Sequence, residues 1–252
     1  MTTGPVLATD GLGLDIGGAT IVADVGLEVA AGEFLGIIGP NGAGKTSLFN
    51  LLSGLLSPTA GRILLRGRDV TRTSPSARAR AGIARTFQLS SVFPALSAFE
   101  NVRLAAEISV GGTMRIWRRA GAVAPAVERA RWALDRIGLA GRAGLPAALL
   151  SGGDRRKLEL AIVLAADADV VLLDEPMAGV SAEDVPELVE VIRSIHRGER
   201  KTVLMVEHHM EVVTGLAERI AVMHDGRVLA CGTPEAVMRD RTVQEAYVGE
   251  AL

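Results

Sequence analysis

Residues 39–47, GPNGAGKTS, restrict the fold of this chain more than any other stretch. Glycines let main-chain N–H groups converge on a small anion, and the N-terminus of a following helix adds partial positive charge. The stretch matches the template G-x-x-x-x-G-K-[ST] and predicts a loop that holds a phosphate chain. The candidate phosphate-contacting residues are Gly39, Asn41, Gly42, Ala43, Gly44, Lys45, Thr46 and Ser47.

The flanking sequence supports this interpretation over a simple glycine turn. A phosphate loop of this kind requires a strand before it and a helix after it. The apolar stretch EFLGIIG (33–39) predicts the strand, and KTSLFNLLSGLL (45–56) predicts the helix. The motif therefore indicates an α/β fold in which the loop joins a buried strand to a helix.

Composition limits the class of protein. The chain has 252 residues, 48% of them hydrophobic, with a net charge of -2. This balance argues against a nucleic-acid binder, which usually carries a basic excess on at least one face. The single cysteine excludes an internal disulfide and is typical of a reducing compartment. Without a basic start followed by an apolar segment, or 18 consecutive apolar residues, we expect a cytosolic chain that does not itself cross a membrane.

Short apolar runs alternate with amphipathic helices along much of the sequence. The runs at 34–38, 170–173 and 202–206 are apolar throughout, as expected for parallel strands buried on both faces. We predict strands at 21–29, 34–38, 62–65, 170–173, 202–206, 219–223 and 227–231. Between Phe87 and Ala161 the pattern becomes purely helical. We therefore predict an α/β core of residues 1–88 and 162–252 with an inserted helical subdomain of residues 89–161.

A magnesium site is expected beside the phosphate loop. The stretch VVLLDEP ends a buried strand with Asp174 and Glu175, and α/β sheets place ligands at the carboxyl ends of their strands. Mg²⁺ prefers hard oxygen ligands and keeps several waters, so Thr46 and Asp174 are candidate ligands. Glu175 lies one residue further on, where a carboxylate could polarise an attacking water.

A second glycine turn begins a helix at LLSGGDRRKLELA (149–161). Ser151 and the main chain of Gly152 and Gly153 form another N-terminus suited to an anion. The chain therefore has two predicted phosphate-binding elements, which raises the question of why a single nucleotide would need both.

The order GPNGAGKTS, RTFQ, LSGGD, VVLLDEP and VEHH resembles the ATP-binding-cassette (ABC) ATPases over essentially the whole chain. The resemblance implies a single P-loop nucleotide-binding domain of ABC type, with a mainly parallel sheet core, an antiparallel β subdomain and the helical insertion. It also implies ATP and Mg²⁺ as ligands. In this family two cassettes pair head to tail, so the second ATPase subunit, a copy or a paralogue, would meet this chain's signature turn.

The resemblance assigns further roles by position. Ser151, Gly152, Gly153 and Asp154 would contact the partner's ATP, Gln88 would join the magnesium shell, and Ile16 occupies the position that stacks on adenine. His208 resembles the switch histidine that touches the γ-phosphate; His209 is the adjacent alternative, but the family's order favours His208. Three positions depart from the pattern: Asp154 replaces the commonest glutamine, Ser181 stands where many relatives have aspartate, and Ile16 replaces an aromatic residue.

Four shorter segments resemble those of the ATPases of branched-chain or hydrophobic amino acid importers. They are ARTFQ, VFPALSAFENV, DEPMAGV and the tail GTPEAVMRDRTVQEAYVGE. This implies a motor subunit that works with multi-span permease subunits, meets a solute-binding protein only indirectly, and lies peripherally on the cytoplasmic side of the inner or plasma membrane. Urea or amide importers and lipopolysaccharide exporters share many of these sequence motifs. A soluble, non-transport ABC ATPase is a further alternative.

Overall fold

The computed structural model describes residues 4–86, 92–109 and 124–247. Its central element is a six-stranded sheet in the order β10-β9-β3-β8-β7-β6. β3 pairs in parallel with β8 and β9, β7 pairs in parallel with β8 and β6, and β10 is antiparallel to β9. The strands are β3 (Phe34–Ile38), β6 (Ile83–Arg85), β7 (Val170–Asp174), β8 (Thr202–Val206), β9 (Arg219–His224) and β10 (Arg227–Gly232).

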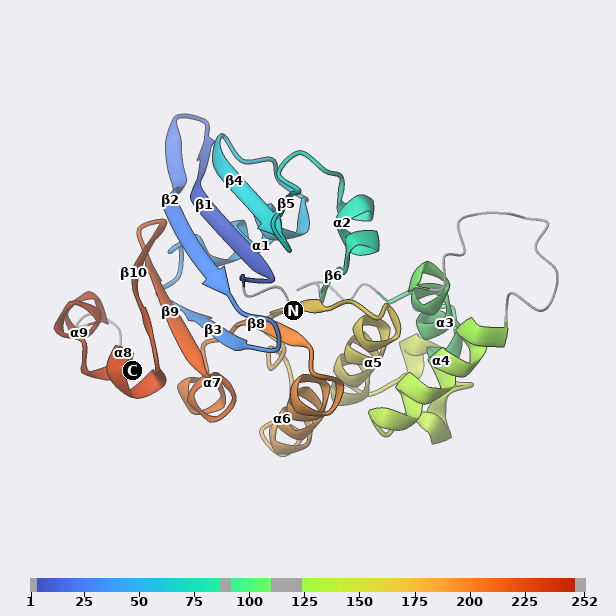
Figure 1. Cartoon of the computed structure of the whole chain (residues 1–252). Coiled ribbons are helices and arrows are strands. Elements are labelled where there is room, and N and C mark those ends of the chain that lie inside the picture. Colours follow the sequence, from blue (N-terminus) through green and yellow to red (C-terminus); the bar gives the residue numbers. More distant parts are fainter. Residues whose placement is uncertain (1–3, 87–91, 110–123, 248–252) are drawn as a thin grey trace.

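A second, four-stranded sheet lies above the first and is antiparallel throughout, in the order β2-β1-β4-β5 (Figure 1). Its strands are β1 (Leu7–Ile16), β2 (Ala19–Val29), β4 (Ala60–Leu65) and β5 (Arg68–Asp69). Helix α1 (Lys45–Ser53) buries Leu48 and Phe49 in one apolar cluster with side chains of both sheets. The helix that follows the phosphate loop therefore joins the two sheets.

The remaining helices pack mainly on the other face of the six-stranded sheet (Figure 1). They include α5 (Gly152–Ala165), α6 (Val185–Arg193) and α7 (Met210–Leu216). Alternation along β3 explains the two cores: Phe34 and Ile38 face these helices, whereas Leu35 and Ile37 face α1. The shorter elements are α2 (Pro75–Ala81), η2 (Ala140–Arg142), η3 (Ala147–Leu149), η4 (Ser194–Gly198), α8 (Pro234–Arg239) and α9 (Arg241–Tyr247).

Between β6 and β7 the described chain is helical, with α3 (Ala98–Ser109) and α4 (Ala124–Arg136) at one end of the molecule, beyond α5 (Figure 1). The expected division at 161/162 falls inside α5, so this helix belongs to both the helical segment and the sheet core. The subdomain boundaries stay a prediction. Within the described residues, no helix is long and apolar enough to cross a bilayer.

The structure confirms the predicted α/β fold, including all seven predicted strands and the parallel pairing of the three apolar runs. It adds β1, β5 and β6, which the sequence analysis did not predict. β1 contains Gly11 and Gly13, and its register with β2 shifts at several places. Glycines and register shifts obscure the alternation by which a strand is recognised in sequence.

Arg78 of α2 is a buried cation that ties α2 to the end of α1. Its guanidinium donates hydrogen bonds to the carbonyls of Leu51, Leu52 (2.9 Å) and Thr71 (2.8 Å). The last carbonyls of a helix lack partners within the helix, so Arg78 supplies a charged donor to them. The carbonyl of Leu51 also accepts from the N–H of Gly54 (3.1 Å). Burial lowers the pKa of the Arg78 guanidinium.

We predict that Arg78→Met lowers the free energy of unfolding by about 3 kcal/mol, because several buried carbonyls lose a charged donor. Urea denaturation followed by circular dichroism measures the change. Arg62→Met is the matched control: the Arg62–Asp10 ion pair (2.6 Å) is exposed, so its loss should cost below about 1 kcal/mol. Equal effects of the two substitutions would contradict the assigned role of Arg78.

Candidate active site

The phosphate loop follows β3 and needs glycine at two positions for different neighbours. Gly39 has φ 152° and Gly44 has φ 94°. A Cβ on Gly39 would lie 2.1 Å from the carbonyl oxygen of Met223, and one on Gly44 would lie 2.7 Å from that of Ile21. Because the backbones of β9 and β2 press against the loop, glycine is required here whether or not an anion is present.

Lys45 begins α1 and is itself held by the loop. Its Nζ donates to the carbonyl oxygens of Gly39 (2.6 Å) and Pro40 (2.8 Å), although the side chain is buried. The cation is therefore aimed across the loop, where a phosphate would meet it. A pocket of about 320 Å³ opens over the loop, lined by Ile21, Asn41, Gly42, Ala43, Gly44, Lys45, Thr46, Ser47, Glu175 and His208.

Asp174, the last residue of β7, is fully buried beside this loop. Arg85 donates to its Oδ2 (2.7 Å), and its Oδ1 has no hydrogen-bond partner among the described residues. Burial raises the pKa of Asp174, while the hydrogen bond and charge of Arg85 oppose the rise. The carboxylate thus presents one unpaired hard oxygen, as a candidate magnesium ligand should.

Glu175 and His208 lie in the loops that follow two adjacent strands, β7 and β8, and meet at the pocket. His208 Nε2 lies 3.0 Å from Glu175 Oε1, and both residues line the pocket. Glu175 has φ 46°, an uncommon conformation for a residue other than glycine, and its N–H donates to the carbonyl of Val206 (2.9 Å). The structure therefore places the candidate water-polarising carboxylate and the candidate switch histidine in contact.

The signature turn lies at the start of α5 and lines no part of this pocket. Ser151 caps the helix: its Oγ accepts from the N–H of Asp154 (3.1 Å) and donates to Asp154 Oδ2 (2.9 Å). Arg142 forms an ion pair with the same carboxylate. Gly153 packs tightly, because a Cβ there would lie 2.9 Å from Asp184 Oδ2, whereas Ser151 and Gly152 remain exposed.

Ile16 and Gln88 are two predicted residues whose roles the described structure does not support. Ile16 ends β1, is 52% exposed and is absent from the pocket lining, where Ile21 of β2 appears instead. Gln88 lies outside the described residues. The roles predicted for both stay predictions.

The sequence analysis missed two charged residues that support the site. Arg85 lies in RTFQ and, besides Asp174, contacts Asn50 Oδ1 (2.7 Å) and Ser53 Oγ (3.0 Å) of α1. Glu207 follows the apolar strand β8 directly and is 2% exposed. For Glu207, a charged residue directly after a fully apolar strand was the available signal. Arg85 ends β6, a strand that the sequence analysis did not predict, so no comparable signal was available for it.

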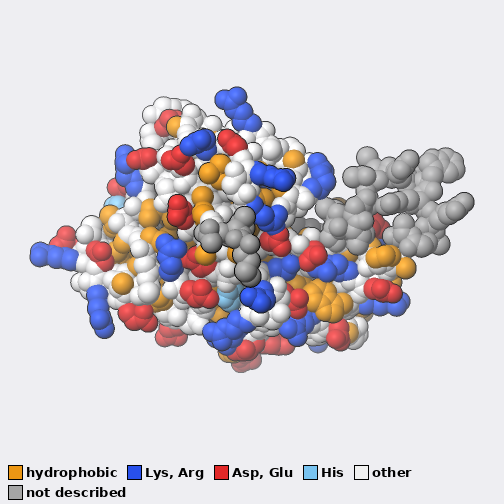
Figure 2. Space-filling model, viewed as in Figure 1, with side chains coloured by type: hydrophobic (Ala, Val, Ile, Leu, Met, Phe, Trp, Pro, Cys, Tyr) orange, Lys and Arg blue, Asp and Glu red, His pale blue; other side chains and the backbone are white. Residues whose placement is uncertain are grey.

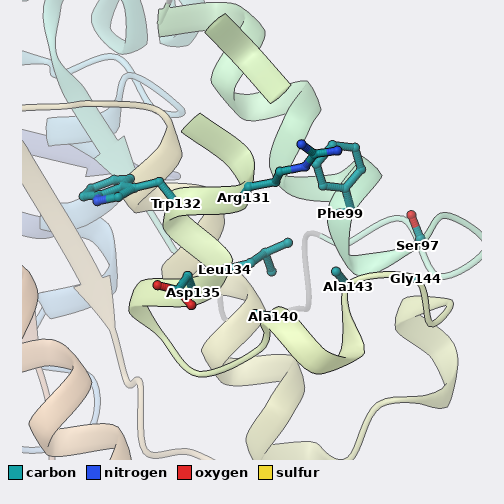
Figure 3. A pocket seen from close by; sticks show the side chains of 9 residues that line it. All are labelled: Ser97, Phe99, Arg131, Trp132, Leu134, Asp135, Ala140, Ala143 and Gly144. Carbon is teal, nitrogen blue, oxygen red and sulfur yellow. The ribbon is translucent and has the colours of Figure 1, made fainter. Parts of the chain in front are cut away.

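A separate hollow of about 730 Å³ lies in the helical segment between α3, α4 and η2 (Figure 3). Phe99 of α3 and Arg131 of α4 point into the same region, and Leu134 contributes an apolar surface. It shares no lining residue with the phosphate-loop pocket. The helical segment therefore carries a hollow of its own, separate from the phosphate-loop pocket.

Comparison with known families identifies the family to which the chain belongs. The family model described as ABC transporter matches residues 22–178, and the model described as branched-chain amino acid ATP-binding cassette transporter matches residues 227–252. The chain belongs to the ABC transporter family and is an ATP-hydrolysing cassette of that family. Within the family, it is homologous to the ATP-binding subunits of branched-chain amino acid transporters.

Individual relatives make this likeness specific. The chain is 38% identical to the high-affinity branched-chain amino acid transport ATP-binding protein LivG of Salmonella typhimurium, over 98% of this chain and 99% of that one. It is 36% identical to the lipopolysaccharide export system ATP-binding protein LptB of Acidithiobacillus ferridurans, over 91% of each. The solved ADP conformation of MJ1267, an ATP-binding cassette of an ABC transporter, matches with a TM-score of 0.84 and 28% identity, covering 97% of this chain and 99% of that one.

The ion pair between Arg85 and Asp174 generates a prediction about the nucleotide-free protein. Both side chains are almost fully buried. Arg85→Met leaves a buried carboxylate without its cation, so we expect the free energy of unfolding to fall by about 3–5 kcal/mol. Urea denaturation in the absence of nucleotide and metal measures it.

The control for this prediction is the double variant Arg85→Met/Asp174→Asn, which removes both charges. Much of the lost stability should return, because the penalty comes from the uncompensated charge. A double variant as unstable as Arg85→Met would show that Arg85 stabilises the site by its contacts with α1 and not by pairing with Asp174.

Proposed function

We propose that this ATPase drives the import of branched-chain or other hydrophobic amino acids, and that it hydrolyses Mg·ATP in the phosphate-loop pocket. The contact between Glu175 and His208 at the pocket carries the proposed mechanism. The solute class is supported by the match of residues 227–252 to the branched-chain transporter model and by the likeness to LivG over nearly the whole chain.

In the proposed mechanism the loop N–H groups and Lys45 bind the β- and γ-phosphates. Glu175 accepts a proton from the attacking water, and His208 holds Glu175 and meets the γ-phosphate from the sheet side. Thr46, Asp174 and, by resemblance, Gln88 would hold Mg²⁺, which when bound neutralises charge on the phosphate oxygens. The unpaired Oδ1 of Asp174 supports this ligand set.

We further propose that two cassettes close head to tail on two ATP molecules. The position of the signature turn supports this arrangement, since Ser151 and Gly152 are exposed and lie apart from the chain's own pocket. An exposed helix N-terminus capped by serine can receive a phosphate from another chain. The signature turn would then complete the partner's site, which answers why one chain carries two predicted phosphate-binding elements.

The proposed transport partner is a multi-span permease that the cassette contacts from the cytoplasmic side of the membrane. Phe93, which is 59% exposed, and the apolar hollow beside Phe99 supply contact surface in the helical segment. Acidic and basic side chains are interspersed over the face in Figure 2, which suits a protein partner better than nucleic acid. A solute-binding protein would be reached only through the permease.

The likeness to LptB supports one alternative, a lipopolysaccharide exporter. The ATPase does not contact the transported solute, so its own site is the same in both proposals. Purification of the cassette with its permease from the native membrane, followed by transport assays with branched-chain amino acids, urea, amides and lipopolysaccharide, distinguishes them. Uptake of leucine or valine is the expected result, and extraction of lipopolysaccharide would overturn the proposed solute class.

The catalytic proposal predicts that Glu175→Gln binds ATP, loses at least about 100-fold in hydrolysis rate and accumulates as a closed dimer. Size-exclusion chromatography with and without ATP measures the dimer. Introducing Ser151→Arg into this variant should abolish the dimer while leaving ATP binding to the monomer intact, because a bulky cation obstructs the trans contact. A Glu175→Gln variant that hydrolyses ATP normally would show that Glu175 has another role.

The departure at Ile16 predicts weak base selectivity. An aliphatic side chain lacks the aromatic stacking that is worth about 1–3 kcal/mol per base, and Ile16 is far from buried. We expect Ile16→Tyr to tighten ATP binding by about five- to a hundredfold, while the parent distinguishes poorly between ATP and GTP. Titrations with ATP, GTP and tripolyphosphate measure this. A strong adenine preference in the parent, unchanged by the substitution, would contradict it.

A further inference from the structure

Glu207 is a buried carboxylate that lies between the two loops carrying Glu175 and His208. Its Oε1 accepts a hydrogen bond from the N–H of Met177 (2.9 Å). Its Oε2 accepts one from the N–H of His208 (2.6 Å) and lies 3.2 Å from Nδ1 of His209. One oxygen therefore serves the loop after β7, and the other serves the loop after β8.

Among the described residues, the backbone hydrogen bonds between these two loops end close to the strand ends. The parallel pairing of β7 with β8 ends at Asp174 and Val206, and the N–H of Glu175 then donates to the carbonyl of Val206. Past this point, the described hydrogen bonds between the loops run through side chains: those of Glu207, and the contact between His208 and Glu175. The Glu207 side chain thus links the loops after β7 and β8 on the pocket side of the last paired strand residues.

The arrangement requires a group with two acceptor oxygens. Donors approach Glu207 from both sides, and among the described residues no lysine or arginine pairs with it. N–H bonds to an ionised carboxylate are shorter and stronger than neutral ones, which suits a link that must hold two loops in register. A glutamine of the same shape has one acceptor oxygen, and its amide NH₂ would face an N–H on the other side.

The loop that donates to Glu207 Oε1 also contains a residue with an unusual backbone conformation. Glu175 has φ 46°, and such conformations persist only where the surroundings hold them. The bond to the N–H of Met177, two residues further on, restrains the segment just after Glu175. The bond to the N–H of His208 restrains the histidine itself.

We propose that Glu207 is a positioning residue for ATP hydrolysis: it joins the two loops so that Glu175 and His208 keep their contact. Glu207 is not among the residues that line the phosphate-loop pocket, so its role runs through these two residues. The inference rests on the roles proposed above for Glu175 and His208. It goes beyond them by assigning a function to a residue outside the pocket lining.

The test is Glu207→Gln in the full-length protein, measured by steady-state hydrolysis and by titration with a fluorescent ATP analogue. We expect kcat to fall about 10- to 100-fold, the range for small misplacements of reacting groups. The dissociation constant for nucleotide should stay within about threefold, because the phosphate loop is untouched. A thermal unfolding curve close to that of the parent shows that the fold is kept.

Glu33→Gln is the matched control. Glu33 is another buried glutamate that accepts at both oxygens, from the N–H of Ala30 (2.7 Å) and from Arg219 (2.9 Å). It precedes β3 and so lies at the opposite end of that strand from the phosphate loop. Its substitution should leave kcat unchanged even if it lowers stability.

A double-mutant cycle with His208→Ala separates positioning from general damage. If Glu207 acts through His208 and Glu175 as one unit, Glu207→Gln should slow single-turnover hydrolysis far less in the His208→Ala background than in the parent. Equal fold-losses in both backgrounds would overturn the proposal. So would a normal kcat in Glu207→Gln, or a loss of nucleotide affinity and thermal stability that parallels the loss of kcat.

The same cycle distinguishes failure of this inference from failure of the proposed function. If His208→Ala alone hydrolyses ATP normally, the role of His208 is wrong and the mechanism proposed above must change. If His208→Ala is defective while Glu207→Gln is normal, the mechanism stands and only the role of Glu207 is rejected.

Discussion

The parallel hydrogen-bonded register of β3, β8 and β7 is the constraint on which the rest of the structure depends. It brings the carboxyl ends of three strands to one edge, so the loops that follow them share one pocket. The phosphate loop follows β3, Glu175 follows β7, and His208 comes shortly after β8. Because both faces of these strands are buried, a one-residue slip would exchange the two cores, so the register is strongly specified.

Buried charge at this edge is balanced by partners from distant segments. Asp174 has Arg85, and Glu207 has N–H groups from two loops. An ionised group removed from water is costly unless paired or hydrogen-bonded, so each of these side chains constrains where its neighbours lie. The same contacts that offset the cost of burial therefore also determine the geometry of the candidate site.

The α5 helix connects the site to the surface that would meet other chains. It packs with α3 and α4 on one side and belongs to the apolar cluster beneath the six-stranded sheet on the other. Its exposed N-terminus carries the signature turn, and Gly153 abuts Asp184 in the segment after Glu175. The signature turn therefore packs against the segment that joins β7 to α6.

The sequence alone determined the α/β class, the apolar parallel strands, the phosphate loop and the family, because each depends on local spacing or an apolar run that one segment displays. It named Glu175 and His208 as candidates, but their 3.0 Å contact depends on the pairing of β7 with β8, some thirty residues apart along the chain. It missed β1, whose glycines and register shifts hide the strand, and it did not single out Arg85 or Glu207. Only the tertiary structure decided the roles of Arg85 and Glu207, because the function of a buried charged residue depends on partners that lie far away in the sequence.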